Sequence, residues 1–531
     1  MRKNLITLTA LALLGGASVL MAQFPDWEAG VPDGCTTITV GKKASADGSV
    51  ITSHTCDSHR TQAWMDVMPA KTYANGEKLT LVRRVANDSL AMPAYGYVPT
   101  GEIPQVRETH GYINTAYPAM NTRQLAVGES TFGGRRELQS SHGHIDCQQL
   151  VHLMMQRCVT AREAIRLTDE LTRKYGWNDA GECLTIADTK EVWHLEIVGP
   201  GEGKVGAIWV AQRVPDGHVS VNANASRIRQ INLDDPDHFM ASKNVFQVAK
   251  EQGWWKPEEG PFEFVYAYAP DNRTSIASRR REWRVLSLVA PSLNLNPESE
   301  NYPFSVQPDK PVTMDKLVEI FQDYYEGTPY NFVKNLTVAD KDGKEVLSPL
   351  ANPFMPYDMN KLFKINGGWG ELGERTIARW YTMYATITQS RDWLPDEVGG
   401  VVWLAFDNAA NSIYVPLYCS ITDVAQPYKT PGRIKGFNHD CAWWAFNRLG
   451  TLAAQRWGDM RHDLDAVWKP MQHELFERQA NFDAQALDLY KVDPAQARAY
   501  LTGVAIEWGD KVVKQAWDLG DLLWTKYDEK F

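Results

Sequence analysis

The sequence predicts an α+β fold in which antiparallel strands form the middle of the molecule and helices lie outside them. Three observations lead to this prediction. Strand-like segments separated by tight turns follow one another between residues 182 and 223. A capped amphipathic helix precedes them, and residues 450–531 carry Trp and Leu at helical spacing. With 531 residues, 44% of them apolar, the chain can bury a large core and a deep site.

The first residues are typical of a secretory signal. Arg2 and Lys3 precede an apolar stretch from Leu5 to Leu20, and small residues around Ala22 follow it. The stretch is short for a membrane-spanning helix of about 20 residues, and no other apolar run reaches that length. We therefore expect residues 1–22 to be a signal peptide, the protein to be exported to the periplasm or beyond the cell, and no membrane span.

Cys35 begins the first strand-like segment after this signal. CTTITV alternates as a strand does, GKKASADG ends in an Asp-Gly turn, and SVITSHT alternates again. The pattern predicts a hairpin whose two open ends face each other. It brings Cys35, at the start of one strand, close to His54 and Asp57 at the end of the other.

Two capped helices are expected ahead of the central strands. Asp146 can cap the first, and Thr160 with Glu163 forms a capping box for the second, which ends near Tyr175 with Gly176 as its stop. The next four strand-like segments predict one antiparallel meander: ECLTIAD from residue 182, EVWHLEIV from 191, KVGAIWVAQRV from 204 and HVSVNA from 218.

The second half of the chain predicts a connector, one helix, more strands and a helical end. Pro291–Pro311 contains five prolines and is expected to be extended, and an amphipathic helix starts near Thr313. Glu374–Gln389 and Gly400–Ile421 are expected to be mainly strands, and Gly450–Phe531 largely helical. Length alone would allow two to four domains.

The seven cysteines are an odd number, so at least one has no disulfide partner. Cys147 and Cys158 lie eleven residues apart on one predicted helix, which separates them by about 16 Å and puts them beyond disulfide reach of each other. Other pairings stay open among Cys56, Cys147, Cys158, Cys183, Cys419 and Cys441, and buried thiols are the alternative.

Composition and missing motifs exclude several functions. A net charge of −10 without a large basic block argues against nucleic acid as a partner. The sequence lacks H-E-x-x-H, G-x-S-x-G, a P-loop and a G-x-G-x-x-G ahead of a helix. We expect no cofactor and no metal, although histidines at 142, 144 and 152, or at 54 and 59, could supply imidazoles.

Cys35 itself offers a chemistry that needs no separate base. Cleavage between Gly34 and Cys35 would create a terminal residue with both a thiol and an α-amino group. An amine with a pKa of about 7.7–8.0 can accept the proton of a thiol with a pKa of about 8.5. Acyl transfer also requires donors for the oxyanion. The alternative is that Cys35 is a disulfide partner or a packed thiol.

The opening segment CTTITVGKKASADGSVITSHTCDSH resembles the amino end of mature family C69 dipeptidases, which are N-terminal-nucleophile hydrolases related to the penicillin and bile-salt acylases. DYYEGTPYN at Asp323–Asn331, ERTIARWYTMYATITQSRDWLP at Glu374–Pro395 and GGVVWLAFDNAANSIYVPLY at Gly399–Tyr418 resemble later stretches of that family in the expected order. The resemblance implies an αββα sandwich, two antiparallel sheets between helical layers. It also implies a propeptide at 23–34, a catalytic domain at 35–450 and a helical extension at 451–531.

The resemblance implies roles for residues around the new terminus. It implies Cys35 as the nucleophile and Asp57 as the carboxylate near its amine. His54 falls where the related acylases carry an arginine, and it is expected to contact substrate. MNTRQLAVGESTFGG is similar to the second conserved block of the acylases. There Thr131 takes the position of their oxyanion-hole asparagine, which leaves Glu129, Ser130 or a backbone N–H to share that work.

Three later residues complete the expected site. In VNANASRI, Asn224 best matches the family's asparagine, with Asn222 as the rival and Arg227 nearby for substrate. ASRRREW puts Arg279 at a position similar to the acylases' later catalytic arginine, although Arg280 or Arg281 could be the one inside. Arg391, with Ser390 beside it, is a further candidate for substrate binding or packing.

These expectations describe an exported cysteine-type dipeptidase acting on short peptides. The alternative enzyme is an acylase or amidase of acylated amino acids or other small amides. The alternative from another class is an exported protein that binds peptide or glycan without turnover. Homo-oligomerisation is left open by the sequence.

Overall fold

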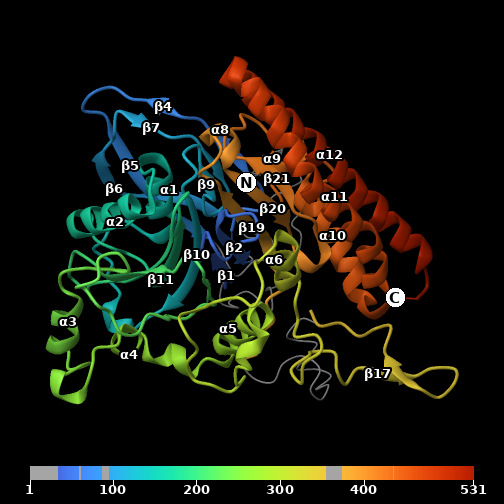
Figure 1. Cartoon of the computed structure of the whole chain (residues 1–531), viewed down its shortest axis with the longest axis horizontal. Coiled ribbons are helices and arrows are strands. Elements are labelled where there is room, and N and C mark those ends of the chain that lie inside the picture. Colours follow the sequence, from blue (N-terminus) through green and yellow to red (C-terminus); the bar gives the residue numbers. More distant parts are fainter. Residues whose placement is uncertain (1–33, 59–60, 87–94, 355–373, 434–435, 531) are drawn as a thin grey trace, which may run out of the picture.

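Two antiparallel sheets face each other at the centre of the molecule, and helices cover their outer faces (Figure 1). The computed structural model describes residues 34–58, 61–86, 95–354, 374–433 and 436–530. The expected signal peptide and all of the expected propeptide except Gly34 lie outside these residues. No described helix is both long enough and apolar enough to cross a membrane.

The first sheet contains both strands of the hairpin that follows Cys35. The hairpin predicted there is present, because Val40 pairs with Ile51 across it. The order of the seven strands is β16 (Ser305–Val306), β14 (Val219–Asn222), β1 (Thr37–Val40), β2 (Val50–Asp57), β19 (Thr382–Ser390), β20 (Val401–Phe406) and β21 (Val415–Tyr418).

The second sheet contains the expected central meander, with one correction. The first three segments pair in order, but the fourth, β14, crosses to the other sheet and pairs with β1. The order of the eight strands is β15 (Phe239–Ala241), β13 (Ile208–Val214), β12 (Val192–Val198), β11 (Gly181–Ala187), β10 (Ala126–Gly133), β9 (Met120–Asn121), β8 (Tyr112–Asn114) and β3 (Asp66–Met68).

The two sheets approach each other closely where β2 meets β10 and β11. The hydroxyls of Thr52 and Thr185 lie 2.7 Å apart across the interface. A Cβ at Gly128 would lie only 2.3 Å from the Ser53 carbonyl oxygen, so this position of β10 requires glycine. The residues of β10 that follow are therefore held against the end of β2.

Helices α1 (Cys147–Arg157) and α2 (Ala161–Tyr175) cover the eight-stranded sheet and share a buried core with it. Their predicted caps are confirmed: the Asp146 carboxylate accepts from the Gln149 N–H, and the Thr160–Glu163 capping box is complete. Gly176 ends α2 with φ 74°, a conformation that glycine tolerates best.

The helical end of the chain covers the seven-stranded sheet (Figure 1). It consists of α10 (Ala442–Gln455), α11 (Trp457–Val492) and α12 (Pro494–Lys526), whose apolar residues share one core with β20 and β21. The αββα arrangement is therefore confirmed. Within the described residues, none of the seven cysteines forms a disulfide.

Two segments of the second half differ from the prediction in detail. The strand expected over Glu374–Gln389 begins only at Thr382, because the residues before it turn toward Asp57. The helix expected from Thr313 is α6 (Met314–Phe321), which Thr313 caps and which stops before Asp323. The proline-rich connector contributes β16, an edge strand beside β14.

Candidate active site

Cys35 lies between the sheets, two residues before β1 begins at Thr37, and only 4% of it is exposed. The predicted meeting of the hairpin ends is confirmed by two backbone hydrogen bonds. The Gly34 N–H donates to the Asp57 carbonyl at 2.9 Å, and the Asp57 N–H donates to the Gly34 carbonyl at 2.8 Å. The Gly34–Cys35 peptide is thus held at the end of β2.

The thiol of Cys35 faces a buried carboxylate from the opposite sheet. Cys35 Sγ donates to Glu129 Oε2 at 3.3 Å, and His54 Nε2 lies 3.5 Å from the same oxygen. Burial, together with the negative charge of Glu129, raises the pKa of the Cys35 thiol well above its usual range. In the intact chain the sulfur is therefore held as a neutral thiol.

Glu129 belongs to a pair of buried carboxyl groups that carry one proton between them. Burial favours the neutral form of Glu129, but the adjacent His54 imidazole and the hydrogen bond from Glu182 outweigh it and lower the pKa of Glu129. Burial and the charge of Glu129 raise the pKa of Glu182 well above its usual range. Thr131 Oγ1 also donates to Glu129 Oε1 at 3.0 Å. Glu129 is therefore the carboxylate of the pair and Glu182 the acid.

Asn224 holds the backbone nitrogen of Cys35. It follows β14 with φ 59°, a left-handed conformation that asparagine adopts more readily than most residues. Its Oδ1 accepts from the Cys35 N–H at 3.0 Å, while its Nδ2 donates to the Thr131 carbonyl at 2.8 Å. The rival Asn222 instead donates from Nδ2 to the Ala225 carbonyl within its own loop. Of the two, the structure brings Asn224 to Cys35.

The arginine at Cys35 is Arg281, not the expected Arg279. Arg281 Nη1 donates to the Cys35 carbonyl at 2.7 Å, and its Nη2 donates to Asn224 Oδ1 at 3.0 Å. Arg279 donates to the carbonyls of Glu298 and Ser299, on the other side of α5 (Ile276–Val289). Two residues along an α-helix are about 200° apart, so the two side chains cannot share a face.

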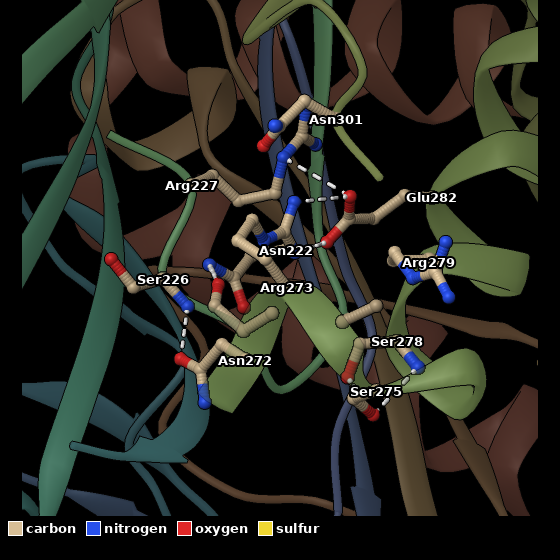
Figure 2. Close-up of polar contacts among 12 residues, drawn as sticks. Asn222, Ser226, Arg227, Asn272, Arg273, Ser275, Ser278, Arg279, Glu282 and Asn301 are labelled. Atoms are coloured by element: carbon tan, nitrogen blue, oxygen red, sulfur yellow. Dashed lines mark hydrogen bonds and ion pairs between the residues drawn. The ribbon is translucent and has the colours of Figure 1, made fainter. Parts of the chain in front are cut away.

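Arg227, expected to contact substrate, belongs to a buried ion cluster (Figure 2). Its Nε lies 3.5 Å from Glu282 Oε2, and Arg273 Nη2 lies 2.8 Å from Glu282 Oε1. Figure 2 shows both guanidinium groups directed at the Glu282 carboxylate, with Arg279 turned away from it. Arg227 also donates to the Val221 carbonyl at 2.6 Å. It therefore holds the chain after β14 in place.

Arg391 is also structural rather than part of the site. It pairs with Asp483 of α11 and donates to the carbonyls of Val398 and Gly399 in α8 (Asp396–Gly399). Ser390 donates to the Gln124 carbonyl at 2.8 Å. These contacts connect the end of β19 to the helical layer, and none of them reaches Cys35.

The expected site omitted two residues that hold Asp57. Arg375 forms an ion pair with Asp57 Oδ2, and Thr382 Oγ1 donates to Asp57 Oδ1 at 2.6 Å. The Asp57 carboxylate is buried at 0% exposure, so this pairing compensates its charge. Both residues lie in the segment Glu374–Pro395 that carried the family resemblance, which is the signal that could have identified them.

The site combines a buried thiol with groups suited to acyl transfer. A thiol, a carboxylate, an amide side chain and a cationic side chain surround one peptide bond, that between Gly34 and Cys35. The ligand atoms of Cys35, His54 and Glu129 also lie within 4.8 Å of one another, and this trio could hold a metal ion.

Comparison with known proteins agrees with this geometry. The model of the family described as "Peptidase family C69" matches residues 34–470. Among curated relatives, a "Probable dipeptidase" of Latilactobacillus sakei is 24% identical over 81% of this chain and 83% of its own length. "Dipeptidase A" of Lactobacillus helveticus is 22% identical over 85% and 90%, and a "Probable dipeptidase" of Salmonella dublin is 25% identical over 72% and 80%. The match starts one residue before Cys35 and spans both sheets, so the chain belongs to peptidase family C69.

Proposed function

We propose that the protein is an exported cysteine-type dipeptidase whose nucleophile is the Cys35 thiol, exposed by cleavage after Gly34. The observation that carries this proposal is the burial of Cys35, whose nitrogen, carbonyl and thiol are each held by a different side chain: Asn224, Arg281 and Glu129. Membership of family C69 and the dipeptidase names of its relatives support the substrate class. The signal-like residues 1–22 support export.

Maturation is proposed to be autocatalytic. Glu129 accepts the thiol proton, and the sulfur attacks the Gly34 carbonyl carbon. The C–N bond then breaks, the Cys35 nitrogen takes the proton, and a thioester joins Gly34 to the sulfur. Water hydrolyses this thioester, releasing Gly34 as a carboxylate and restoring the thiol. The acceptor for the first proton is already in hydrogen-bond contact with Sγ.

Peptide hydrolysis follows the same chemistry on an external bond. The free amine of Cys35 takes the thiol proton, and the sulfur attacks the carbonyl of the first substrate residue. The amine passes the proton to the leaving amino group, and water then clears the thioester. Asn224 and Arg281 hold the terminal residue in position for these steps.

Glu129 is proposed to recognise the substrate's free α-amino group. In a peptide the α-nitrogen lies about 2.5 Å from the carbonyl carbon of its own residue. A carbonyl carbon next to Sγ therefore brings that nitrogen within reach of Glu129 Oε2, which lies 3.3 Å from the sulfur. A buried carboxylate at this distance binds an ammonium and disfavours a blocked, neutral nitrogen. This favours a dipeptidase over an acylase of N-acylated amino acids.

Intact mass and dipeptide turnover test the proposal together. The wild-type chain is expected to begin at Cys35 and to hydrolyse dipeptides, whereas Cys35→Ala is expected to keep Gly34 and to lack turnover. Cys441→Ser is the matched control, since this thiol is also buried but donates to the Thr430 carbonyl. A wild-type enzyme that retains residues before Cys35, with dipeptide turnover unchanged in Cys35→Ala, would contradict the proposal.

A further inference from the structure

We propose that Cys35, His54 and Glu129 form a zinc site that overlaps the nucleophile, so that Zn²⁺ inhibits the enzyme reversibly and competes with substrate. The existence of the site depends on geometry alone. Its inhibitory effect rests on the proposed function, because it requires that the bound sulfur be the nucleophile. The three ligands come from three places in the fold: two residues before β1, the middle of β2 and the middle of β10.

The distances between these ligands fit tetrahedral zinc. Zinc binds thiolate sulfur at about 2.3 Å and imidazole nitrogen or carboxylate oxygen at about 2.0–2.2 Å. In a tetrahedron these bonds put sulfur and oxygen about 3.5 Å apart, and nitrogen and oxygen about 3.3–3.4 Å apart. The measured separations are 3.3 Å from Cys35 Sγ to Glu129 Oε2 and 3.5 Å from His54 Nε2 to Glu129 Oε2. The third pair, Cys35 Sγ and His54 Nε2, lies within 4.8 Å.

One ring nitrogen of His54, Nε2, is available as a metal ligand. His54 is 2% exposed, and its Nε2 has no hydrogen-bond partner among the described residues. Its contact with Glu129 Oε2, at 3.5 Å, is longer than a good hydrogen bond, and a metal bond would replace that weak contact. Its other ring nitrogen, Nδ1, lies 3.4 Å from the Tyr384 hydroxyl, which keeps Nε2 directed toward Glu129.

The carboxylate is oriented in the same way. Thr131 Oγ1 donates to Glu129 Oε1, the oxygen that faces away from the thiol, and leaves Oε2 for the metal. Such outer contacts to ligands are typical of zinc sites. Zinc would displace the thiol proton, forming a Zn–S bond and releasing H⁺ to solvent. One thiolate and one carboxylate then balance the charge of Zn²⁺ in this buried place.

Three protein ligands leave a fourth position for water or substrate. The zinc ion would nevertheless hold the sulfur lone pair needed for attack and the carboxylate proposed for the substrate ammonium. Inhibition, competitive with dipeptide, is therefore expected. Chelation should restore full turnover.

Metal binding is tested with Co²⁺ on chains produced to begin at residue 35, because the variants at Cys35 and Glu129 are not expected to mature by themselves. Thiolate-to-cobalt charge-transfer absorption reports a Co–S bond without any assay of activity. The wild-type enzyme is expected to bind one Co²⁺ with this absorption and to lose it when Zn²⁺ is added. Cys35→Ala should lack the absorption. His54→Gln and Glu129→Gln should weaken Co²⁺ and Zn²⁺ binding at least tenfold. His152→Gln is the matched control, since this half-buried histidine contacts Tyr112 instead.

Turnover of a dipeptide by the wild-type, His54→Gln and His152→Gln enzymes completes the test. Zn²⁺ should inhibit the wild-type and His152→Gln enzymes equally and His54→Gln at least tenfold more weakly, with reversal by EDTA. Thermal midpoints measured without metal show that each variant is folded.

Equal metal affinity in wild-type, His54→Gln and Glu129→Gln would overturn the site. A Co–S bond at Cys35 with undiminished turnover would overturn the nucleophile role and with it the proposed function. Turnover lost on chelation and restored by Zn²⁺ would overturn inhibition.

Discussion

Arg375 forms a buried ion pair with Asp57 directly against the backbone of Gly34, the residue that precedes the proposed nucleophile. A Cβ placed on Gly34 would lie 2.0 Å from Arg375 Nη1 and 3.1 Å from Asn224 Oδ1. Steric crowding therefore explains why the residue before Cys35 is glycine. Any larger residue would disturb both the ion pair and the amide that holds the Cys35 nitrogen.

Gly34→Val is expected to slow removal of the residues before Cys35 at least tenfold, because the valine side chain displaces Arg375 and Asn224 from the peptide to be cleaved. Intact mass measured over time after expression follows the conversion. Gly217→Val is the control, since nothing lies within 4 Å of a Cβ at that turn position. Equal processing of both variants would show that close packing at Gly34 is unimportant.

Arg375→Met is expected to lower the free energy of unfolding by about 3–5 kcal/mol, because it leaves the Asp57 carboxylate buried without its cation. Urea unfolding measures the change. The double variant Asp57→Asn with Arg375→Met should be destabilised by less than the sum of the single variants, since it buries no unpaired charge. Additive losses would argue that the two residues are not coupled.

Glu129→Gln, produced to begin at Cys35 because maturation is proposed to use Glu129, is expected to reduce kcat/KM for dipeptides about 30-fold or more, the loss typical of removing one partner of a buried charged contact. Turnover of the matching N-acetylated dipeptide should change much less, because that substrate has no ammonium. Glu196→Gln is the control, a buried carboxyl that accepts from the Ser226 hydroxyl and from backbone N–H groups. A uniform loss on both substrates would instead indicate a general disturbance of Cys35.

Asp407 is expected to make stability depend on pH. Burial raises the pKa of this carboxyl to about 7, although hydrogen bonds from Asn447 and the Asn408 backbone oppose the shift. Because the folded-state pKa is above the ordinary 3.8, the folded protein binds a proton more tightly than the unfolded chain. The contribution to stability is thus fully present below about pH 4 and is lost as pH rises to about 7.

Asp407→Asn removes this titration. Relative to wild-type, the variant should gain up to roughly 4 kcal/mol of unfolding free energy between pH 4 and pH 8. Urea unfolding of both proteins across that range measures the difference. A difference that is independent of pH would show that Asp407 titrates at its ordinary value.

The features predicted correctly from sequence depend on neighbours along the chain. The hairpin from Cys35 to Asp57 follows from strand alternation and an Asp-Gly turn, and the caps at Asp146 and Thr160 follow from contacts three residues away. The alternation of apolar residues in the strands and their helical spacing elsewhere also predicted the α+β class. The proximity of Cys35 to Asp57 could be predicted from the sequence because one short turn joins the two strands.

The errors all concern contacts between distant segments. β14 was assigned to the meander because its alternation is the same in either sheet, and only long-range pairing with β1 puts it in the other one. Arg279 and Arg281 are indistinguishable in a run of three arginines until packing decides which face of α5 meets Cys35. Arg227 and Arg391 likewise pair with carboxylates, Glu282 and Asp483, that lie 55 and 92 residues away along the chain.

By itself, the sequence determined the class of fold, the position of the nucleophile candidate and its partner across the hairpin, because local periodicity and turn chemistry specify these. The tertiary structure alone decided that Glu129 and His54 face the thiol, that Arg281 rather than Arg279 holds its carbonyl, and that Arg375 neutralises Asp57. A buried charge is stable only when it is paired. Which residue pairs with it depends on how the two sheets and their helices pack in space, and not on the spacing of residues along the chain.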